Sequence, residues 1–270
     1  MFFRRSLEGL FALSACLCAA NAHASASKWE HAEGGSVRVV IASAPDKDGN
    51  LAGILQIRLK PGWKTYWRDP GDAGVPPTLE IASGGGAVAV QMDYPAPRRF
   101  DDGYSVWAGY DSDVSFPFTL AAGQAKEALS ASVFIGICET ICVPLQARLD
   151  IGSRTAEQQA SDATAIAAAL AALPKPAQEG FAASIVAADK DKLTVEAQLP
   201  ADASKAELFV AATQSHTFEE PELVSQEAGK AVFSVPLLDP PEDDGGQQDA
   251  IHYTLVTDDD AVSGVLTFRR

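Results

Sequence analysis

Between residues 36 and 152 the chain is a series of short apolar runs, each ended by glycine, proline or a charged turn. The run at residues 37–41 is rich in β-branched side chains, which favour strands. Asp-Lys-Asp-Gly-Asn at residues 46–50 is typical turn chemistry, and the apolar pattern resumes at residues 51–59. Strands and helices do not alternate, which disfavours a parallel α/β fold and favours an antiparallel sandwich. Further strands are expected at residues 87–92, 114–120 and 131–137.

Residues 153–180 differ in composition. Thr155 and Gln158 fit a helical capping box, and alanine-rich sequence follows until Pro174 and Pro176 end the pattern. We interpret this segment as one helix and a stiff linker between two domains. A helix packed within one continuous domain is the alternative. Strand patterns return at residues 181–270, so we expect an all-β protein with domains at residues 28–152 and 181–270.

The first 24 residues have the parts of an export signal. Arg4 and Arg5 are followed by an apolar run at residues 10–20, and Ala22-His23-Ala24 fits the cleavage rule. We expect a signal peptide at residues 1–24. Residues 13–16 also resemble a lipoprotein box, which leaves lipidation of Cys16 as the alternative, although the short apolar run before it favours ordinary cleavage. No later run approaches the roughly 18 apolar residues of a membrane span, so no transmembrane segment is expected in the mature chain.

The formal net charge is −15. Such acidity argues against binding to nucleic acid or to an anionic membrane surface. The spacing of His31, His216 and His252 is not that of metal ligands, and we expect neither a metal site nor a cofactor.

Cleavage of the signal would remove Cys16 and Cys18 and leave Cys138 and Cys142 as the cysteines of the mature chain. In an oxidising compartment a lone close pair tends to form a disulfide. Along one straight strand the two would lie about 13 Å apart, beyond bonding distance. A hairpin with residues 139–141 as its loop instead places them opposite one another.

The alternation around the pair supports this hairpin. In the proposed register Val133, Ile135 and Ile137 meet the apolar positions of residues 143–151, and the cysteines fall on the other, more accessible face. The neighbouring sequence contains no lysine or histidine, and Glu139 disfavours a thiolate. We therefore expect the disulfide to act as an electrophile that a partner's thiolate opens. A permanent structural staple and a Cu(I) dithiolate site are the alternatives.

The two sulfurs are expected to differ in exposure. Pro144 lacks an N–H and suits an edge strand, where a partner's active site can dock. Cys138 follows Ile135-Gly136-Ile137, a run typical of a buried strand end. We predict that Cys142 is the more exposed sulfur and forms the intermolecular mixed disulfide, with Cys138 as the resolving thiol.

Three blocks of the sequence resemble the N-terminal periplasmic domains of DsbD/ScsB-type thiol:disulfide interchange proteins. They are GWKTYWRDPGDAGVPP at residues 62–77, Gly-Tyr followed by VSFP within residues 109–117, and CETICVP at residues 138–144. The blocks occur in family order and cover about residues 30–152. The resemblance implies a periplasmic, immunoglobulin-like sandwich that receives electrons through Cys138 and Cys142 and passes them to periplasmic acceptors.

The chain also departs from the family pattern. The cysteines are closer together than in DsbD, and in this respect they resemble the ScsB-like branch. Full-length members continue into a transmembrane electron carrier and a thioredoxin-like domain, and neither follows here before Arg270. If the chain is an electron relay or a protein-disulfide reductase, we expect a separate thioredoxin-like or transmembrane thiol-disulfide protein as its donor. A non-catalytic interaction or copper-handling protein with a structural disulfide is the alternative.

Two aromatic segments are further candidates. Trp63, Tyr66 and Trp67 are expected to close the sandwich core, and direct contact with a partner is the alternative. Residues 100–104 lie where DsbD-like domains carry a loop that caps the disulfide. An ordinary acidic turn is the alternative there. The cap candidates are Phe100, Asp101, Asp102 and Tyr104.

Overall fold

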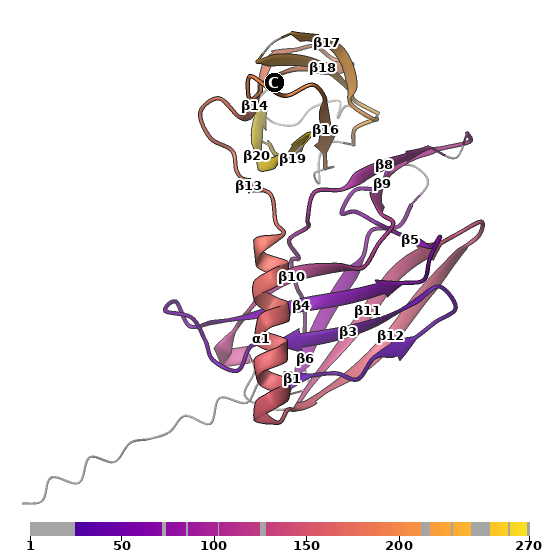
Figure 1. Cartoon of the computed structure of the whole chain (residues 1–270), viewed down its shortest axis with the longest axis vertical. Coiled ribbons are helices and arrows are strands. Elements are labelled where there is room, and N and C mark those ends of the chain that lie inside the picture. Colours follow the sequence, from indigo (N-terminus) through magenta and orange to yellow (C-terminus); the bar gives the residue numbers. More distant parts are fainter. Residues whose placement is uncertain are drawn as a thin grey trace, which may run out of the picture.

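The computed structural model describes residues 25–71, 74–84, 86–101, 103–124, 128–211, 217–227, 229–238, 249–258 and 260–268. The predicted export signal with Cys16, as well as Asp102 and His216, lie outside these residues. Two β regions are stacked end to end, and one long helix runs along the side of the first region (Figure 1). The expected all-β, immunoglobulin-like architecture followed by a second β region is confirmed.

The first β region is an antiparallel sandwich. Within the described residues its strands are hydrogen-bonded in the order β10-β4-β3-β1-β12-β11-β5-β9-β8; β2 pairs with β3, and β6 pairs with β11 and β7. The strands are β1 (Ser25–Ala26), β2 (Glu30–His31), β3 (Gly35–Ile41), β4 (Asn50–Leu59), β5 (Lys64–Tyr66), β6 (Thr78–Ser83), β7 (Gly86–Ala89), β8 (Arg98–Asp101), β9 (Val106–Tyr110), β10 (Val114–Ala121), β11 (Leu129–Cys138) and β12 (Cys142–Ser153); a 3₁₀ turn spans Ala122–Gln124.

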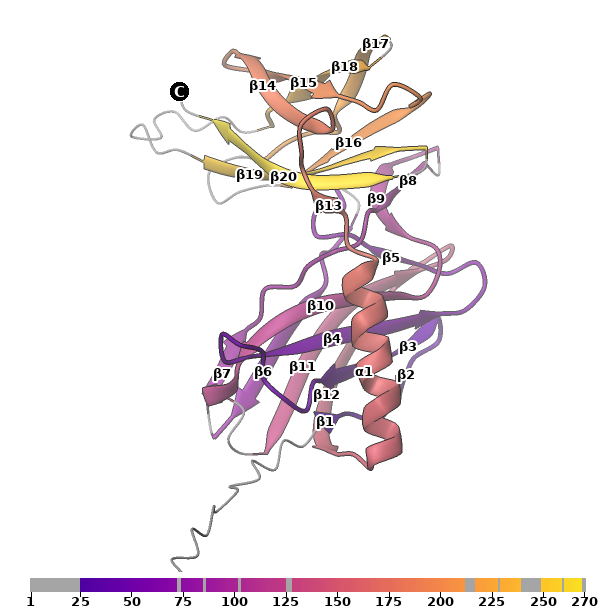
Figure 2. The ribbon, with the colours of Figure 1, turned by 60° about the vertical axis from the view of Figure 1, so that its left-hand side comes forward.

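The helix explains why β3 is buried on both faces. Val39 packs into the sandwich core, whereas Val40, the next residue, belongs to a separate cluster with Ile166 of the helix. The helix α1 (Ala156–Ala171) begins with the predicted capping box, in which the Thr155 side chain accepts from the Gln158 N–H and the Gln158 side chain accepts from the Thr155 N–H. Figure 2 shows α1 lying across these strands.

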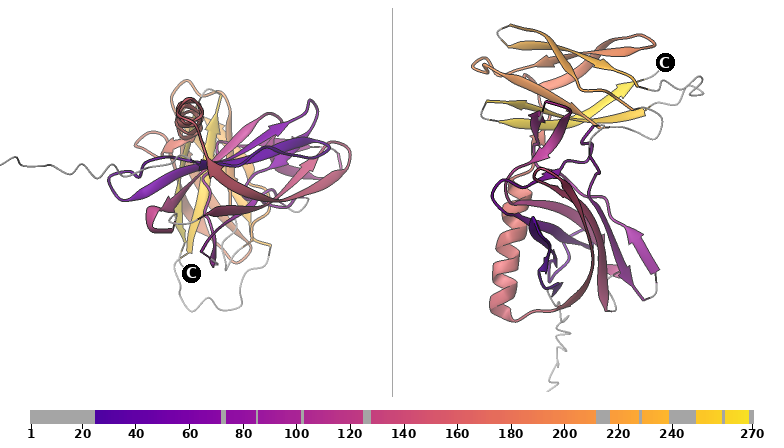
Figure 3. Two further views of the ribbon diagram at one scale, coloured as in Figure 1. Left: turned by 90° about the horizontal axis from the view of Figure 1, so that it is seen from below. Right: turned by 90° about the vertical axis from the view of Figure 1, so that its right-hand side faces the viewer.

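In the described part of the second β region, two four-stranded sheets, β13-β20-β19-β16 and β14-β15-β18-β17, pack face to face (Figure 3). Lys175 and Pro176, expected in a linker, pair in parallel with β20 and so belong to the second region. The strands are β13 (Lys175–Pro176), β14 (Ala182–Ala188), β15 (Lys192–Gln198), β16 (Ala206–Val210), β17 (Glu222–Glu227), β18 (Lys230–Pro236), β19 (Asp249–Thr257) and β20 (Ala261–Phe268).

The two β regions share a packed boundary. Phe209 and Ala211, at the end of β16, belong to the hydrophobic cluster of the first region, and the Phe209 ring meets Trp67 edge-on at 5.9 Å between centroids. Arg99 of β8 crosses the same boundary to Glu220. That residues 28–152 and 181–270 fold independently stays a prediction.

Candidate functional site

The site is a disulfide at the tip of the longest hairpin of the first region. Strands β11 and β12 pair from Leu129↔Ile151 to Cys138↔Cys142, the register that the alternation predicts. The two sulfurs are bonded, and their Cα atoms lie 4.1 Å apart. Residues 139–141 form the loop between them. The hairpin therefore brings together two cysteines that one straight strand would have kept apart.

The two cysteines differ in burial. Cys138 is 7% exposed because it lies between β12 and β5, where it is paired with Lys64. Cys142 is exposed, since within the described residues the first ten positions of β12 pair only with β11. The predicted difference in exposure is confirmed. Which sulfur reacts with a partner stays a prediction.

Tyr66 holds its hydroxyl against the disulfide. The hydroxyl oxygen lies 3.0 Å from Cys138 Sγ and 3.0 Å from Cys142 Sγ, and the side chain is only 4% exposed. Disulfide sulfurs carry no proton, so the tyrosine O–H is the donor. Gly136 makes room for this ring, because a Cβ there would lie 2.8 Å from it. The Thr65 hydroxyl donates to the Gly136 carbonyl at 2.9 Å and fixes β5 against β11.

An aromatic stack backs this tyrosine. Trp107 of β9 meets Tyr66 edge-on at 5.2 Å between centroids, and Phe100 of β8 stacks on Trp107 at 4.5 Å. These three rings and Cys138 form one small cluster, separate from the main core. The stack therefore shields Cys138 and leaves Cys142 open.

A small cavity of about 150 Å³ opens beside the disulfide. Its lining includes Lys64, which local sequence did not associate with the cysteines and which the β5–β11 pairing places opposite Cys138. The ammonium group lies 5.8 Å from the centre of the Phe100 ring. The residues around the cavity are Lys64, Tyr66, Phe100, Asp101, Ser105, Trp107, Cys138, Glu139, Thr140 and Cys142.

The predicted cap segment begins in a strand, and Gly103 and Tyr104 follow in a bend. Phe100 and Asp101 end β8, which pairs with β9 from Arg98↔Gly109 to Asp101↔Val106. Phe100 and Asp101 line the cavity beside the disulfide. Tyr104 has a fully exposed side chain and lines a different cavity of about 540 Å³ at the boundary of the two β regions. The structure thus brings Phe100, and not Tyr104, next to the cysteines.

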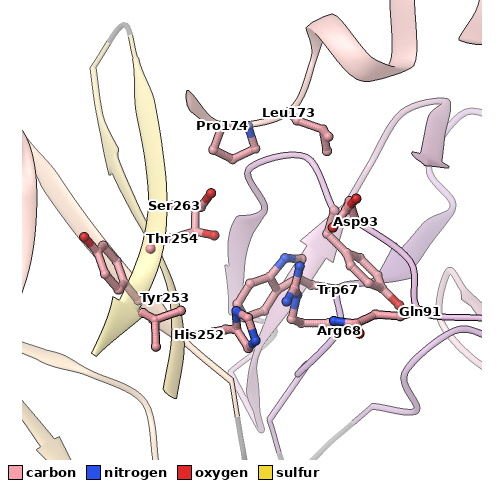
Figure 4. A pocket seen from close by; sticks show the side chains of 13 residues that line it. Trp67, Arg68, Gln91, Asp93, Leu173, Pro174, His252, Tyr253, Thr254 and Ser263 are labelled. Atoms are coloured by element: carbon pink, nitrogen blue, oxygen red, sulfur yellow. The ribbon is translucent and has the colours of Figure 1, made fainter. Parts of the chain in front are cut away.

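The two tryptophans of the first sequence block lie away from the sulfurs. Trp67 is 2% exposed and belongs to the main core, and Trp63 packs against that core over Gly34. Figure 4 shows Trp67 and Arg68 beside His252 in a cavity of about 270 Å³ between the two regions. This is the packing expected for Trp63 and Trp67. For Tyr66, sequence reasoning missed the contact with both sulfurs.

The arrangement can support thiol–disulfide exchange. An attacking thiolate can reach Cys142 Sγ from solvent, and the leaving Cys138 sulfur gains negative charge beside the Tyr66 hydroxyl. A hydrogen bond to a charged acceptor is stronger than one to a neutral acceptor, so this hydroxyl stabilises the thiolate more than the disulfide. This stabilisation of the leaving thiolate favours bond cleavage.

Removal of that hydroxyl is expected to slow reduction. In Tyr66→Phe the pKa of the Cys138 thiol should rise, and reduction by a dithiol partner should slow about tenfold, the effect of losing one hydrogen bond to a charged group. Stopped-flow kinetics and the ultraviolet absorbance of the thiolate measure the two quantities. Tyr104→Phe, which removes an exposed hydroxyl, is the control. Equal rates in the two variants would show that Tyr66 has no part in the exchange.

The first β region is thus an immunoglobulin-like sandwich with an accessible disulfide at a hairpin tip. Residues 36–152 match the family model described as "Thiol:disulfide interchange protein DsbD, N-terminal", and the chain carries a domain of this type over those residues.

A solved structure extends the likeness to the second region. The N-terminal periplasmic domain of ScsB from Proteus mirabilis is 21% identical, with a TM-score of 0.72, and the match covers 91% of this chain and 98% of that chain. At this identity the likeness establishes a shared fold. Among curated proteins none matches this sequence.

Two further observations concern metal ligands and membrane-spanning helices. Within the described residues no group of three or more His, Cys, Asp or Glu side chains is arranged to hold a metal ion. In the same part of the chain no helix is long and apolar enough to cross a membrane.

Proposed function

We propose that this chain is a periplasmic electron relay, in which Cys138 and Cys142 accept two electrons from one thiol protein and pass them to another. The observation that carries the proposal is the Tyr66 hydroxyl placed 3.0 Å from both sulfurs of a disulfide whose Cys142 side is open. A permanent staple needs no donor at its sulfurs, whereas a bond that is cleaved and reformed benefits from a group that stabilises the leaving thiolate.

Reduction would proceed in two exchanges. A partner's thiolate attacks Cys142 Sγ, a mixed disulfide forms, and the bond to Cys138 breaks with the electron pair on Cys138. Cys138 then takes a proton from solvent. The partner's second thiolate attacks its own bonded sulfur, closes the partner's disulfide and releases Cys142 as a thiolate, which is also protonated. Two electrons and two protons enter the chain, and the reverse sequence passes them to an acceptor.

The proposed partners follow from this chemistry. The donor is a thioredoxin-like or transmembrane thiol-disulfide protein, and the acceptors are disulfides of periplasmic proteins. Periplasmic localisation is supported by the predicted export signal and by the DsbD-type domain at residues 36–152. We propose that the mature chain begins at Ser25 or close by.

The reduction potential of Cys138–Cys142 tests the proposal. The oxidised protein is equilibrated with dithiothreitol buffers, and the free thiols are counted after alkylation. Because Cys142 is exposed, we expect a potential above about −300 mV, the value below which disulfides resist physiological reduction. A lower potential would make the bond a structural staple and refute the relay.

A further inference from the structure

The β8–β9 hairpin has two faces with different neighbours. Phe100 lies on the face toward the disulfide, where it stacks on Trp107. Arg99 is the preceding residue, and side chains alternate along a strand, so it lies on the opposite face. That face meets the second β region: Arg99 Nε lies 3.0 Å from Glu220 Oε1, and Nη2 donates to the Leu208 carbonyl at 3.1 Å. Figures 1 and 2 both show the hairpin next to the second region.

These contacts make Arg99 more than a surface ion pair. Its side chain is 21% exposed, and its guanidinium lies 4.7 Å from the centre of the Phe209 ring. Phe209 is itself buried against Trp67. A planar guanidinium that donates in two directions while stacked on a ring is held in one geometry. Arg99 therefore fixes β8 relative to β16 and to the segment that contains Glu220.

The hairpin arm has little else to hold it. β8 is the last strand of the sheet, and within the described residues its strand pairing is with β9 alone. A short edge arm of this kind opens at a low free energy unless side chains secure it. The neighbouring Arg98 pairs with Asp111, which directly follows β9, so this largely exposed ion pair connects β8 to its own hairpin and not to the second region.

We propose, on the basis of the proposed relay function, that Arg99 is a positioning residue through which the second β region controls access to Cys138. While Arg99 is bound to Glu220 and Leu208, the arm keeps Phe100 against Trp107 and Cys138 stays covered. When Arg99 loses these contacts, the β8 arm moves away from Trp107 and exposes Cys138, the resolving thiol. Attack on Cys138 in place of Cys142 in the disulfide, or reaction of the freed Cys138 thiolate with a foreign disulfide, would misdirect the exchange. By keeping Cys138 covered, the second region protects the order of the two steps.

Alkylation of single cysteines tests the proposal without a redox partner. In a Cys142→Ser background, Cys138 is the remaining thiol of the mature chain, and its reaction with iodoacetamide is followed by mass spectrometry. Each rate is corrected to the thiolate fraction from the measured thiol pKa. Addition of Arg99→Ala should raise the rate about three- to tenfold, because the rate follows the population of the open arm.

Two variants that each remove an acidic partner of an arginine distinguish the Arg99–Glu220 ion pair from general effects of charge. Glu220→Ala should raise the Cys138 rate about two- to threefold, less than Arg99→Ala because the hydrogen bond to Leu208 remains. Asp111→Ala is the matched control: it breaks the ion pair of the adjacent arginine within the first region and should leave the rate unchanged. In a Cys138→Ser background, Arg99→Ala should not alter the rate at Cys142, which is already exposed.

The proposal is overturned if iodoacetamide labels Cys138 in the Arg99→Ala and Glu220→Ala variants at the same rate as in the Asp111→Ala variant. It is also overturned if Arg99→Ala accelerates labelling at both cysteines alike, because that indicates general loosening. Should Arg99→Ala fail to fold, Glu220→Ala against Asp111→Ala decides. A reduction potential typical of a structural disulfide would refute the relay without changing the alkylation rates of Cys138. Failure of the relay and failure of the Arg99 proposal can therefore be told apart.

Discussion

Cys138→Ser is expected to form a stable mixed disulfide with a thioredoxin-like partner that lacks its resolving cysteine, whereas Cys142→Ser is expected to form little. In the first variant the exposed sulfur is retained and no second thiol can release the partner. In the second variant the remaining thiol is 7% exposed and lies behind the aromatic stack. Since one sulfur is open and the other covered, the difference in yield should be large.

Non-reducing gels and intact-mass measurement report the adducts, starting from partner activated with a chromogenic disulfide so that each exchange releases a countable thiol. The double variant, with both cysteines replaced, is the control for attachment elsewhere. An adduct with Cys142→Ser alone would reverse the assignment of attacking and resolving sulfur. If neither single variant forms an adduct, the Cys138–Cys142 disulfide has a structural role.

Trp67→Ala should lower the free energy of unfolding by about 3–5 kcal/mol, the range for truncation of a large buried aromatic side chain. Trp67 is 2% exposed, belongs to the core of the first β region and also contacts Phe209 of the second. The substitution therefore opens a cavity where the two regions meet. Because Phe209 also supports Arg99, the covering of Cys138 should loosen as well.

Urea denaturation followed by circular dichroism measures this loss. Tyr104→Ala, which removes a fully exposed aromatic side chain, is the control and should unfold close to the parent midpoint. A Trp67→Ala midpoint equal to that of Tyr104→Ala would show that Trp67 does not stabilise the boundary. Two separated transitions in the parent protein would instead support independent folding of the two β regions.

Local pattern was sufficient to predict the hairpin of the disulfide and the start of the helix. Register follows from alternation, because a shift by one residue would turn Val133, Ile135 and Ile137 away from the core. A capping box is likewise decided within four residues, here Thr155 to Gln158. In both places the interactions that determine the structure lie close together in the sequence.

The groups around the disulfide could not be predicted in this way. Tyr66 is 72 residues from Cys138 in sequence, and its contact arises from the pairing of the three-residue strand β5 with β11. The same pairing places Lys64 at the cavity. A detectable signal was Gly136 in an otherwise apolar strand, because a glycine there marks the close approach of another group. The strand β8 within the cap segment was not predicted, because it carries charged residues and lacks strand alternation.

The disulfide closes a ring of only five residues, since its cysteines are four positions apart. The entropy lost by an unfolded chain through a cross-link grows with the size of the ring, and for one this small it corresponds to about 2 kcal/mol. Long disulfide loops in small secreted domains contribute roughly twice as much. Moreover, the backbone pairing of β11 with β12 extends for nine residue pairs beyond the cysteines. Opening the bond should therefore leave the sandwich folded, and we expect the disulfide to be reduced and reformed without passage through an unfolded form.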